Sequence, residues 1–539
     1  MSRPEAPSTV HPLLDTAAKA LRFGRRDEAR SALLQAADLA AGDAALLEEI
    51  ARSLEDAADR EGARRVYKRC LLTDPDRYLA HSRLGAIQFE NGEIEEATFH
   101  LERANTLKPG DPAILNNLGL LYEIGDKPER AIETLTRALE KGAPEDFVKG
   151  TLAGIYEDSN LLEPLKALLD EALPKFPGDF YLNLIAAKLK RREGDLEGAR
   201  TRLEGLDPSH QPNDAQVIYH FEMGRILDAA GDYEKAFTHF ETGNRLSAAE
   251  PSFRVFDKKR AREQVRMLDA LDLSSWKTPA AEEGTERAPA FLIGFPRSGT
   301  TLLTQVLDAH PALEVLEEKP ILARLTLLLD EEAEPFPKGL ETLSAAKAAS
   351  LRAHYAIHAD TLRKRDPSRL LVDKFPLHIL DVPLIAKLFP RAKMILALRH
   401  PCDVVLSCFM QNFGPNAAML NFLTLEDATA YYAAVMALWQ KFRREIPLEV
   451  LEIRYERIVE NLEREARALV TFLGLPWDEA VLSYRERAMA KARINTPSYH
   501  QVIKPIYREA VGRWRHYEPF LKPYVPRLAP FCRDFGYEL

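Results

Sequence analysis

The chain has 539 residues, of which 46% are hydrophobic and 29% are charged, a composition typical of a soluble globular protein with two or more domains. Its formal net charge of −9 argues against a nucleic-acid partner, because such proteins present a strongly basic surface. The sequence shows no secretory signal and no run of about 18 apolar residues that could span a membrane, so we expect a cytoplasmic protein without a membrane partner.

A period of 34 residues runs through the first half of the chain. Small residues and prolines recur at this interval, as in Ala29, Ala63, Ala97 and Ala131, in Gly85 and Gly119, and in Pro75 and Pro109. Small residues allow two helices to cross closely, and proline ends a helix. After a short tail of residues 1–9, the period predicts about seven helical hairpins over residues 10–248, with an insertion between Ala199 and Ala236.

The order of glycine, alanine and proline within each period resembles the tetratricopeptide (TPR) repeat. The resemblance implies an α-helical TPR solenoid whose groove binds a peptide or protein, although a purely structural stack remains the alternative. Residues 254–273 then have the pattern of one more amphipathic helix, and the stretch after it mixes Pro, Gly, Ser and charge without periodicity. We therefore assign residues 249–288 to a connecting helix and linker.

The remaining residues, 289–539, alternate short apolar runs with helical patterns. The four runs are residues 290–294, 369–374, 392–399 and 448–456. Such alternation predicts an α/β domain with a parallel sheet and helices on both faces. Lys374, Arg399 and Tyr455 fall near the carboxyl ends of three of these strands, where the ligand groups of parallel sheets gather.

The stretch "GFPRSGTTLL" at residues 294–303 joins the first strand to a helix. Gly294 and Gly299 are spaced like the glycines of a nucleotide-binding P-loop, but Thr300 stands where that loop has lysine. Unpaired N–H groups at a helix start, together with hydroxyl groups and an arginine, favour phosphate binding. The sequence therefore predicts a P-loop-like phosphate site, against the alternative of an ordinary strand-to-helix turn.

The loop and a later arginine together resemble sulfotransferases that use 3′-phosphoadenosine 5′-phosphosulfate (PAPS). In "LRHPCDVVLS", Ser407 follows Arg399 by eight residues, as in that family. The resemblance implies the sulfotransferase fold with PAPS as sulfuryl donor and 3′-phosphoadenosine 5′-phosphate (PAP) as product. It also implies two sets of nucleotide contacts: Arg297, Ser298, Gly299, Thr300 and Thr301 for the 5′ end, and Arg399, Ser407 and Tyr455 for the 3′-phosphate. Lys504, or Arg513, would complete the nucleotide site.

Further segments in residues 289–520 resemble tyrosylprotein sulfotransferases, in the same order: "LDAHPALEVLEEKPIL", "LVDKFP", "FLGLPWDEAVL" and "SYHQVIKP". This resemblance implies that Glu318 is the catalytic base and that Lys374 and Ser498 stabilise the transition state. Those enzymes are membrane proteins of the secretory pathway with disulfides and no TPR half, and residues 324–368 show no match. The acceptor therefore does not follow from the fold; we expect a peptide or protein hydroxyl, with tyrosine as the natural choice.

Sulfuryl transfer requires in-line positioning and charge stabilisation. Lys374 would stabilise the charge that develops on the departing nucleotide. Glu318, or Glu317 as the alternative, would take the proton of the acceptor hydroxyl, and Arg297 would orient this carboxylate. Each residue has a plainer interpretation: a solvated acidic run for the glutamates, an ion pair with Asp373 for Lys374, a surface hydroxyl for Ser407, core packing for Tyr455 and a turn for Ser498.

The cysteines do not indicate a metal. Cys70, Cys402, Cys408 and Cys532 form no CxxC pair, so we expect neither a zinc site nor a disulfide framework, and sulfuryl transfer requires no metal. Two other functions stay open on the sequence alone. One is a P-loop kinase or NTPase in which Asp373 helps to hold Mg²⁺, and the other is a non-catalytic TPR scaffold beside a degenerate enzyme domain.

Overall fold

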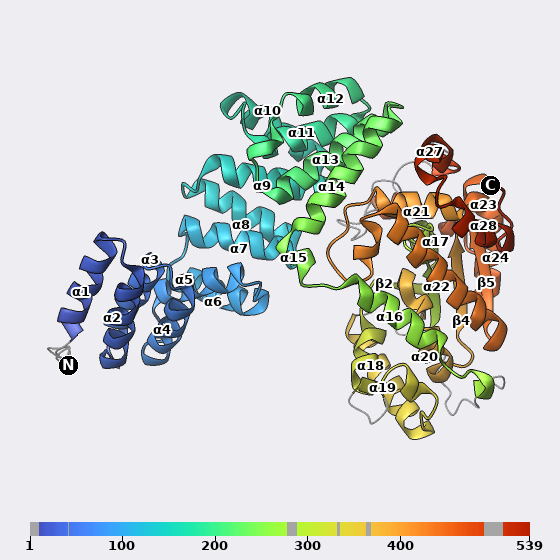
Figure 1. Cartoon of the computed structure of the whole chain (residues 1–539), viewed down its shortest axis with the longest axis horizontal. Helices are drawn as coiled ribbons and strands as arrows, with labels where there is room; N and C mark the ends of the chain where they lie inside the picture. Colours follow the sequence, from blue (N-terminus) through green and yellow to red (C-terminus); the bar gives the residue numbers. More distant parts are fainter. Residues whose placement is uncertain (1–9, 41, 277–287, 331–334, 363–367, 490–509) are drawn as a thin grey trace. The chain divides into compact units, whose positions relative to one another are not determined.

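The structure is a computed structural model that describes residues 10–40, 42–276, 288–330, 335–362, 368–489 and 510–539 (Figure 1). The chain folds into two compact units, Met1–Leu189 and Lys190–Leu539. Among the described residues, none of the helices combines the length and the apolar character needed to cross a bilayer.

The first unit consists of consecutive helices that pair as hairpins in the predicted 34-residue register. They are α1 (Val10–Arg22), α2 (Arg26–Leu39), α3 (Ala44–Asp56), α4 (Arg60–Thr73), α5 (Tyr78–Glu90), α6 (Ile94–Leu107), α7 (Pro112–Ile124), α8 (Pro128–Glu140), α9 (Glu145–Asp158), α10 (Leu162–Lys175) and most of α11 (Phe180–Glu193). The predicted TPR-like helical region is confirmed.

The repeated small residues lie where two helices of a hairpin touch. A Cβ atom added to Gly85 of α5 would lie 2.7 Å from Cγ of Leu101 on α6, and one added to Gly119 of α7 would overlap Leu135 of α8. Ala97 of α6 is fully buried. The period in the sequence therefore records the closest approach of each helix pair.

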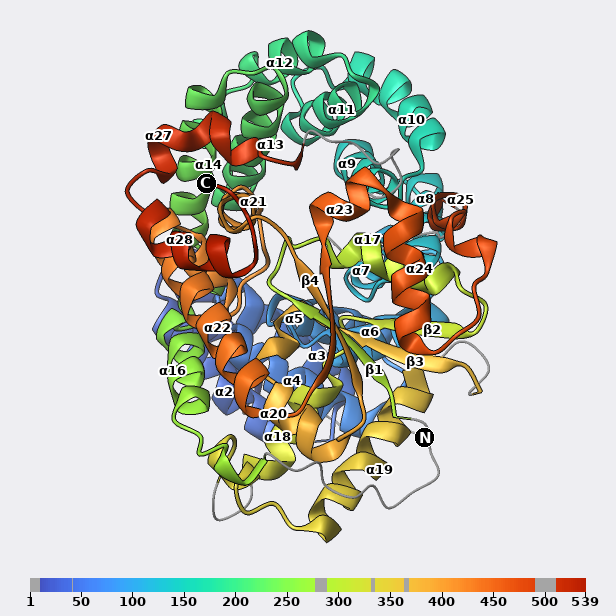
Figure 2. The same ribbon diagram turned by 90° about the vertical axis from the view of Figure 1, so that its right-hand side faces the viewer.

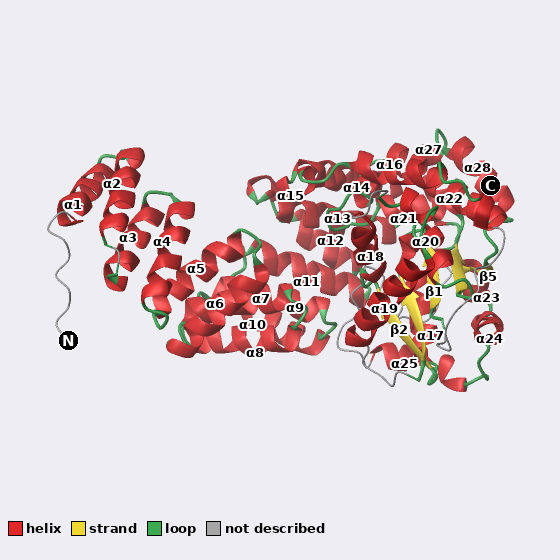
Figure 3. Cartoon of the chain, turned by 90° about the horizontal axis from the view of Figure 1, so that it is seen from below, coloured by secondary structure: helices red, strands yellow, loops and turns green. Residues whose placement is uncertain are grey.

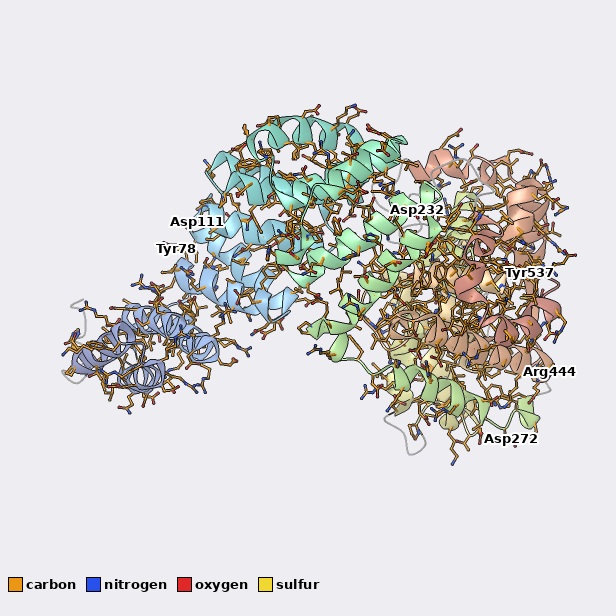
Figure 4. The ribbon with its side chains drawn as sticks, turned by 45° about the horizontal axis from the view of Figure 1, so that its top comes forward. Tyr78, Asp111, Asp232, Asp272, Arg444 and Tyr537 are labelled. Carbon is orange, nitrogen blue, oxygen red and sulfur yellow. The ribbon has the colours of Figure 1, made fainter. Side chains whose placement is uncertain are left out.

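Aspartate side chains cap several of these helices. The carboxylate of Asp111 accepts hydrogen bonds from the N–H groups of Ala113 (3.1 Å) and Ile114 (3.4 Å) at the start of α7. Asp232 caps α14 in the second unit in the same way, through the N–H of Lys235. Both aspartates are labelled in Figure 4. Such caps satisfy N–H groups that a helix leaves unpaired and fix where each helix begins.

The second unit opens with the last repeat-like helices. They are α12 (Leu196–Glu204), α13 (Asn213–Ala229), α14 (Tyr233–Ala249), α15 (Pro251–Arg254) and α16 (Lys258–Asp269). Gly224 of α13 faces the ring of Phe240 on α14, as Gly85 faces Leu101. The expected insertion contains the short 3₁₀ turn Pro208–His210, and the expected helix over 254–273 is divided into α15 and α16. The predicted boundary between residues 248 and 249 stays a prediction.

A parallel sheet of five strands forms the centre of the α/β part (Figure 3). Its strands are β1 (Ala290–Gly294), β2 (Leu313–Glu317), β3 (Leu370–Lys374), β4 (Lys393–Leu398) and β5 (Glu449–Arg454), in the order β2-β3-β1-β4-β5. Four of them lie where the sequence predicts strands, and β2 was not predicted. The predicted α/β fold with a parallel sheet is confirmed.

Helices cover both faces of this sheet (Figure 2). α17 (Thr300–Ala309) and α24 (Leu462–Leu473) bury apolar side chains against one face. On the other face, Phe291 of β1 contacts Tyr355 of α19 (Ala345–Leu362) and Phe389 at the end of α20 (Val382–Leu388). The remaining described α-helices are α18 (Ile321–Asp330), α21 (Pro401–Phe409), α22 (Leu425–Glu445), α23 (Tyr455–Glu460), α25 (Tyr484–Met489), α27 (Glu518–Leu521) and α28 (Val525–Asp534).

Candidate functional site

The strand order places a switch point at β1. From β1 the chain builds β2 and β3 on one side of this strand, and then β4 and β5 on the other. Loops that leave the carboxyl ends of β1 and β4 therefore diverge, and ligands of open parallel sheets bind in the crevice that results. The loop Gly294–Thr301 follows β1, and Arg399 follows β4.

The loop after β1 has a constrained backbone. Arg297 and Gly299 both have a left-handed conformation, with φ of 69° and 96°. A Cβ atom at Gly299 would lie 2.8 Å from Cδ2 of Tyr455, so glycine is required there for its conformation and for space. An arginine in this conformation is uncommon and is a feature of functional loops.

The loop presents the groups that an anion needs. Helix α17 begins at Thr300, directly after Gly299, so the N–H groups of its first turn have no carbonyl partner within the helix. Ser298 is buried, and its Oγ has no hydrogen-bond partner in the described part of the chain. Both observations fit a bound phosphate or sulfate group, as the sequence predicts for this loop.

The residues predicted to bind the 3′-phosphate lie next to this loop. Arg399 is buried; its Nη1 donates to the carbonyl of Arg297 (3.2 Å), and its guanidinium lies 5.2 Å from the ring centre of Tyr455. Nε of Arg297 donates to Oγ of Ser407 (3.1 Å). The Nε atom of Arg399 is buried without a partner among the described residues. Arg297, Arg399, Ser407 and Tyr455 thus form one cluster.

Tyr455 occupies this cluster from an unexpected element. The sequence suggests the end of a strand at 448–456, but β5 ends at Arg454 and Tyr455 is the first residue of α23. Burial raises the pKa of its hydroxyl, so the group stays protonated at neutral pH and can donate a hydrogen bond to an anion.

A buried lysine bridges two glutamates at the carboxyl ends of β2 and β3. Nζ of Lys374 lies 2.6 Å from Oε1 of Glu318 and 3.2 Å from Oε1 of Glu317, and its side chain is fully buried. Lys374 and Glu317 are register partners of neighbouring parallel strands, which brings their side chains together. Among the described residues, Lys374 pairs with these glutamates, whereas Asp373 accepts a hydrogen bond from the hydroxyl of Tyr355 (2.9 Å).

Glu318 has a strained backbone directly after β2. Its φ is 51°, in the left-handed region, and its N–H donates to the carbonyl of Lys374 (2.7 Å). The side chain of Glu318 is 36% exposed and that of Glu317 is 21% exposed, so Glu318 is the more accessible of the two carboxylates. Strain at a charged residue that directly follows a strand is typical of functional positions.

Three sequence predictions fall elsewhere. Ser498 and Lys504 lie outside the described residues. Arg513, the alternative to Lys504, binds Asp228 of α13 through Nε (3.1 Å) and Nη2.

The structure also contains groups that the sequence did not indicate. His378, fully buried, lies between Asp373 and Asp381, 2.7 Å from the latter. His400, Cys402 and Cys532 form a buried set of three possible metal ligands in the described chain, whose ligand atoms lie within 4.8 Å of one another. Both ring nitrogens of His400 already have backbone partners, the N–H of Cys402 and the carbonyl of Glu538. No spacing rule links Cys402 to Cys532, because distant helices bring them together.

Residues 289–479 match the model of the Sulfotransferase family. An uncharacterized protein of Aquifex aeolicus (strain VF5) is 28% identical over 83% of this chain, and the chain spans only 58% of that relative's length. Protein-tyrosine sulfotransferase 1 of Danio rerio is 28% identical over 46% of this chain and 72% of its own length. Protein-tyrosine sulfotransferase 2 of Gallus gallus is 27% identical over 59% of this chain and 86% of its own length.

Among solved structures, a tetratricopeptide repeat protein from Parabacteroides merdae is 17% identical and covers 44% of this chain and 94% of its own, with a TM-score of 0.38. The relatives and the family model confirm the predicted sulfotransferase family domain in the C-terminal half of the chain and its distant relationship to protein-tyrosine sulfotransferases.

Proposed function

We propose that this sulfotransferase family domain transfers a sulfuryl group from PAPS to an acceptor hydroxyl. The observation that carries the proposal is the fully buried Lys374, which bridges Glu317 and Glu318. These residues lie at the carboxyl ends of the strands, as does the loop after β1. A buried cation beside an accessible carboxylate suits a reaction in which one group loses a proton while another gains negative charge.

The donor would be held by the cluster around the loop after β1. PAPS supplies the sulfuryl group and a nucleotide that leaves with negative charge. The loop residues Arg297 to Thr301 would bind its 5′ end, and Arg399, Ser407 and Tyr455 its 3′-phosphate. The buried Oγ of Ser298 and Nε of Arg399, both without partners among the described residues, fit such an anion.

The two glutamates have different roles in this proposal. Glu317 is the less exposed, so it would keep Lys374 in place, and the more exposed Glu318 would accept the proton of the attacking hydroxyl. Lys374 would stabilise the charge that develops on the departing nucleotide. The ion pair with Lys374 orients the Glu318 carboxylate before the acceptor arrives.

The acceptor is proposed to be a hydroxyl group of a peptide or protein, with tyrosine first, recruited by the TPR-like repeats. Two facts support this choice: several relatives carry the name protein-tyrosine sulfotransferase, and a helical repeat region precedes the domain on the same chain. Incubation with PAPS and peptides that contain tyrosine, serine or threonine, followed by mass spectrometry, would identify the modified residue by the added sulfuryl group.

Nucleotide binding separates this proposal from a P-loop kinase or NTPase. Isothermal titration calorimetry of the full chain should detect binding of PAP without Mg²⁺ and no binding of Mg²⁺-ATP. Substitution Arg399→Ala should weaken PAP binding at least about tenfold, because hydrogen bonds to charged groups contribute about 1.5–3 kcal/mol. Tight binding of Mg²⁺-ATP with no binding of PAP would instead support the kinase or NTPase.

Transfer of radiolabelled sulfate from PAPS tests the catalytic roles. Glu318→Gln should lower kcat by about 10²–10⁴-fold, the usual contribution of a general base. Glu317→Gln should have a smaller effect, and Glu463→Gln on the exposed surface of α24 serves as the control for loss of one carboxylate. If Glu318→Gln and Lys374→Ala both retain full transfer, the assignment is wrong; if only Glu317→Gln is inactive, the roles of the two glutamates are reversed.

A further inference from the structure

The segment Ala510–Phe520 lies against the donor cluster. The carbonyl of Ala510 accepts a hydrogen bond from Nη2 of Arg399 (2.5 Å). The N–H groups of Gly512 and Trp514 both donate to the carboxylate of Asp403 on α21, at 2.8 Å each. Asp403 is buried, so these two bonds fix the turn firmly. The position of the segment thus determines one of the hydrogen bonds that hold Arg399.

The other side of this segment is bound by Asp228 of the repeat-like helix α13. The Asp228 carboxylate accepts from Nε and Nη2 of Arg513 and from the hydroxyl of Tyr517 (2.7 Å). Only 14% of the Asp228 side chain and 28% of the Arg513 side chain are exposed. A two-pronged pair of this kind, partly shielded from water, fixes orientation as well as distance.

Aromatic stacking continues the contact along the next helix. The ring of Phe237 on α14 stacks on Phe520 at 3.9 Å and on Phe409, the last residue of α21, at 5.1 Å between ring centres. Tyr233 stacks on His516 at 4.4 Å. The hairpin α13–α14 therefore contacts both α21, which carries Ser407, and the segment that touches Arg399.

We propose that Asp228 is a positioning residue for donor binding. Through this residue, the last repeat-like hairpin, α13–α14, contributes to donor binding by the sulfotransferase domain. Asp228 fixes Arg513 and Tyr517, and these fix the turn whose Ala510 carbonyl holds Arg399. Without the carboxylate, the turn keeps its bonds to Asp403 but loses its support on the hairpin side, and Arg399 is held less firmly for the 3′-phosphate. The inference rests on the proposed function, because it concerns the donor site.

Hydrogen exchange in the absence of nucleotide tests the support directly. In Asp228→Asn, the amides of Gly512 and Trp514 should exchange faster than in the wild type. Asp214→Asn, an exposed aspartate in the first turn of the same helix, is the matched control and should leave both amides unchanged. Unchanged protection in Asp228→Asn overturns the proposal. Tyr517→Phe removes only the hydroxyl and should also make these amides exchange faster. This variant replaces Asp228→Asn in the experiment if Asp228→Asn fails to fold.

The effect on the site is tested with PAP. Asp228→Asn should raise the dissociation constant of PAP by about three- to thirtyfold, the range expected for residues that act through others. The KM for PAPS should rise while kcat and the KM for the acceptor stay constant, which a general loss of structure would not produce. The charge exchange Asp228→Arg with Arg513→Asp should recover part of the affinity.

The two proposals fail differently. If the wild type binds no PAP, the proposed function is refuted, and the role of Asp228 in donor binding is refuted as well. If the wild type binds PAP and Asp228→Asn binds it equally well, the positioning role alone is refuted.

Discussion

His378 is the clearest case in this protein of one residue whose charge is set by its surroundings. Burial alone lowers the pKa of an imidazole, but the nearby carboxylates of Asp373 and Asp381, the second of them hydrogen-bonded to Nδ1 (2.7 Å), outweigh burial and raise the pKa of His378 to about 9. His378 lies in the 3₁₀ turn Pro376–Ile379 that follows β3, and its partner Asp373 directly precedes Lys374 on that strand. Successive side chains of a strand point to opposite faces, so the His378 group supports β3 from the face opposite Lys374.

This raised pKa gives a pH dependence of stability with a defined sign. The folded protein holds the proton on His378 more tightly than the unfolded chain, so the stabilisation is complete below about pH 6.5 and is lost as the pH rises towards 9. Its upper limit is about 3 kcal/mol. Urea unfolding of the wild type and of His378→Gln at pH 6 and pH 9 should give a difference that shrinks at the higher pH. A difference that is equal at both values would show that the pKa of His378 is not raised in the folded state.

At the scale of helices, glycine has opposite consequences at two positions of the repeat region. Gly119→Ala in α7 should destabilise the protein, because the new Cβ overlaps Leu135, and crowding of this kind costs about 1–3 kcal/mol. Gly154→Ala in α9 is the matched control, because no atom lies within 4 Å of the added Cβ. There, alanine should stabilise the helix by about 0.5–1 kcal/mol. Denaturant unfolding measures both, and equal effects would mean that α7 and α8 do not approach as closely as described.

The sequence predicts the elements that repeat or alternate and misses those defined by single residues. The 34-residue period locates the helices because every hairpin has the same close contact, at Gly85 or Gly119 and their partners. Strand β2 escapes prediction because it is short and ends in Glu317, so "LEVLEE" is typical of a solvated acidic run. The pattern at 457–474 suggests one helix, but the structure has two, α23 and α24. Asn461 caps the start of α24, because its side chain accepts a hydrogen bond from the N–H of Arg464.

The functional site also contains some features that the sequence predicts and others that it does not. Arg399, Ser407 and the loop could be predicted because their spacing is local. The pairing of Lys374 with Glu317 depends on which strands are neighbours, and the contact of Arg513 with Asp228 joins residues 285 positions apart. No periodicity or spacing in a single sequence encodes such contacts, because they arise from the tertiary packing of distant helices.

At the scale of the whole molecule, both compact units contain the same histidine pair. The Nδ1 atoms of His81 and His100 lie 2.8 Å apart in the first unit, and those of His220 and His239 lie 3.0 Å apart in the second. Each pair joins the two helices of one hairpin, and its ring centres are 5.0 Å apart. A single proton shared between two Nδ1 atoms allows at most one ring of each pair to be protonated, since two protonated rings would repel each other.

Acid should therefore weaken both units over the same pH range. Burial lowers the pKa of His100 and of His220 to about 4, so between pH 6.5 and 4 the unfolded chain takes up protons that the folded hairpins exclude, and stability falls as the pH falls. We expect a loss of about 1–2 kcal/mol per pair, less than the full shift because the rings are partly exposed.

Hydrogen exchange, read separately for residues 10–189 and for the described residues after 190, assigns the loss to each unit. His100→Gln should reduce the acid sensitivity of the first unit alone, because glutamine takes up no proton, and His220→Gln should do so for the second alone. If either substitution changes the acid response of both units equally, the two units do not unfold independently, and the pairs act on one cooperative structure.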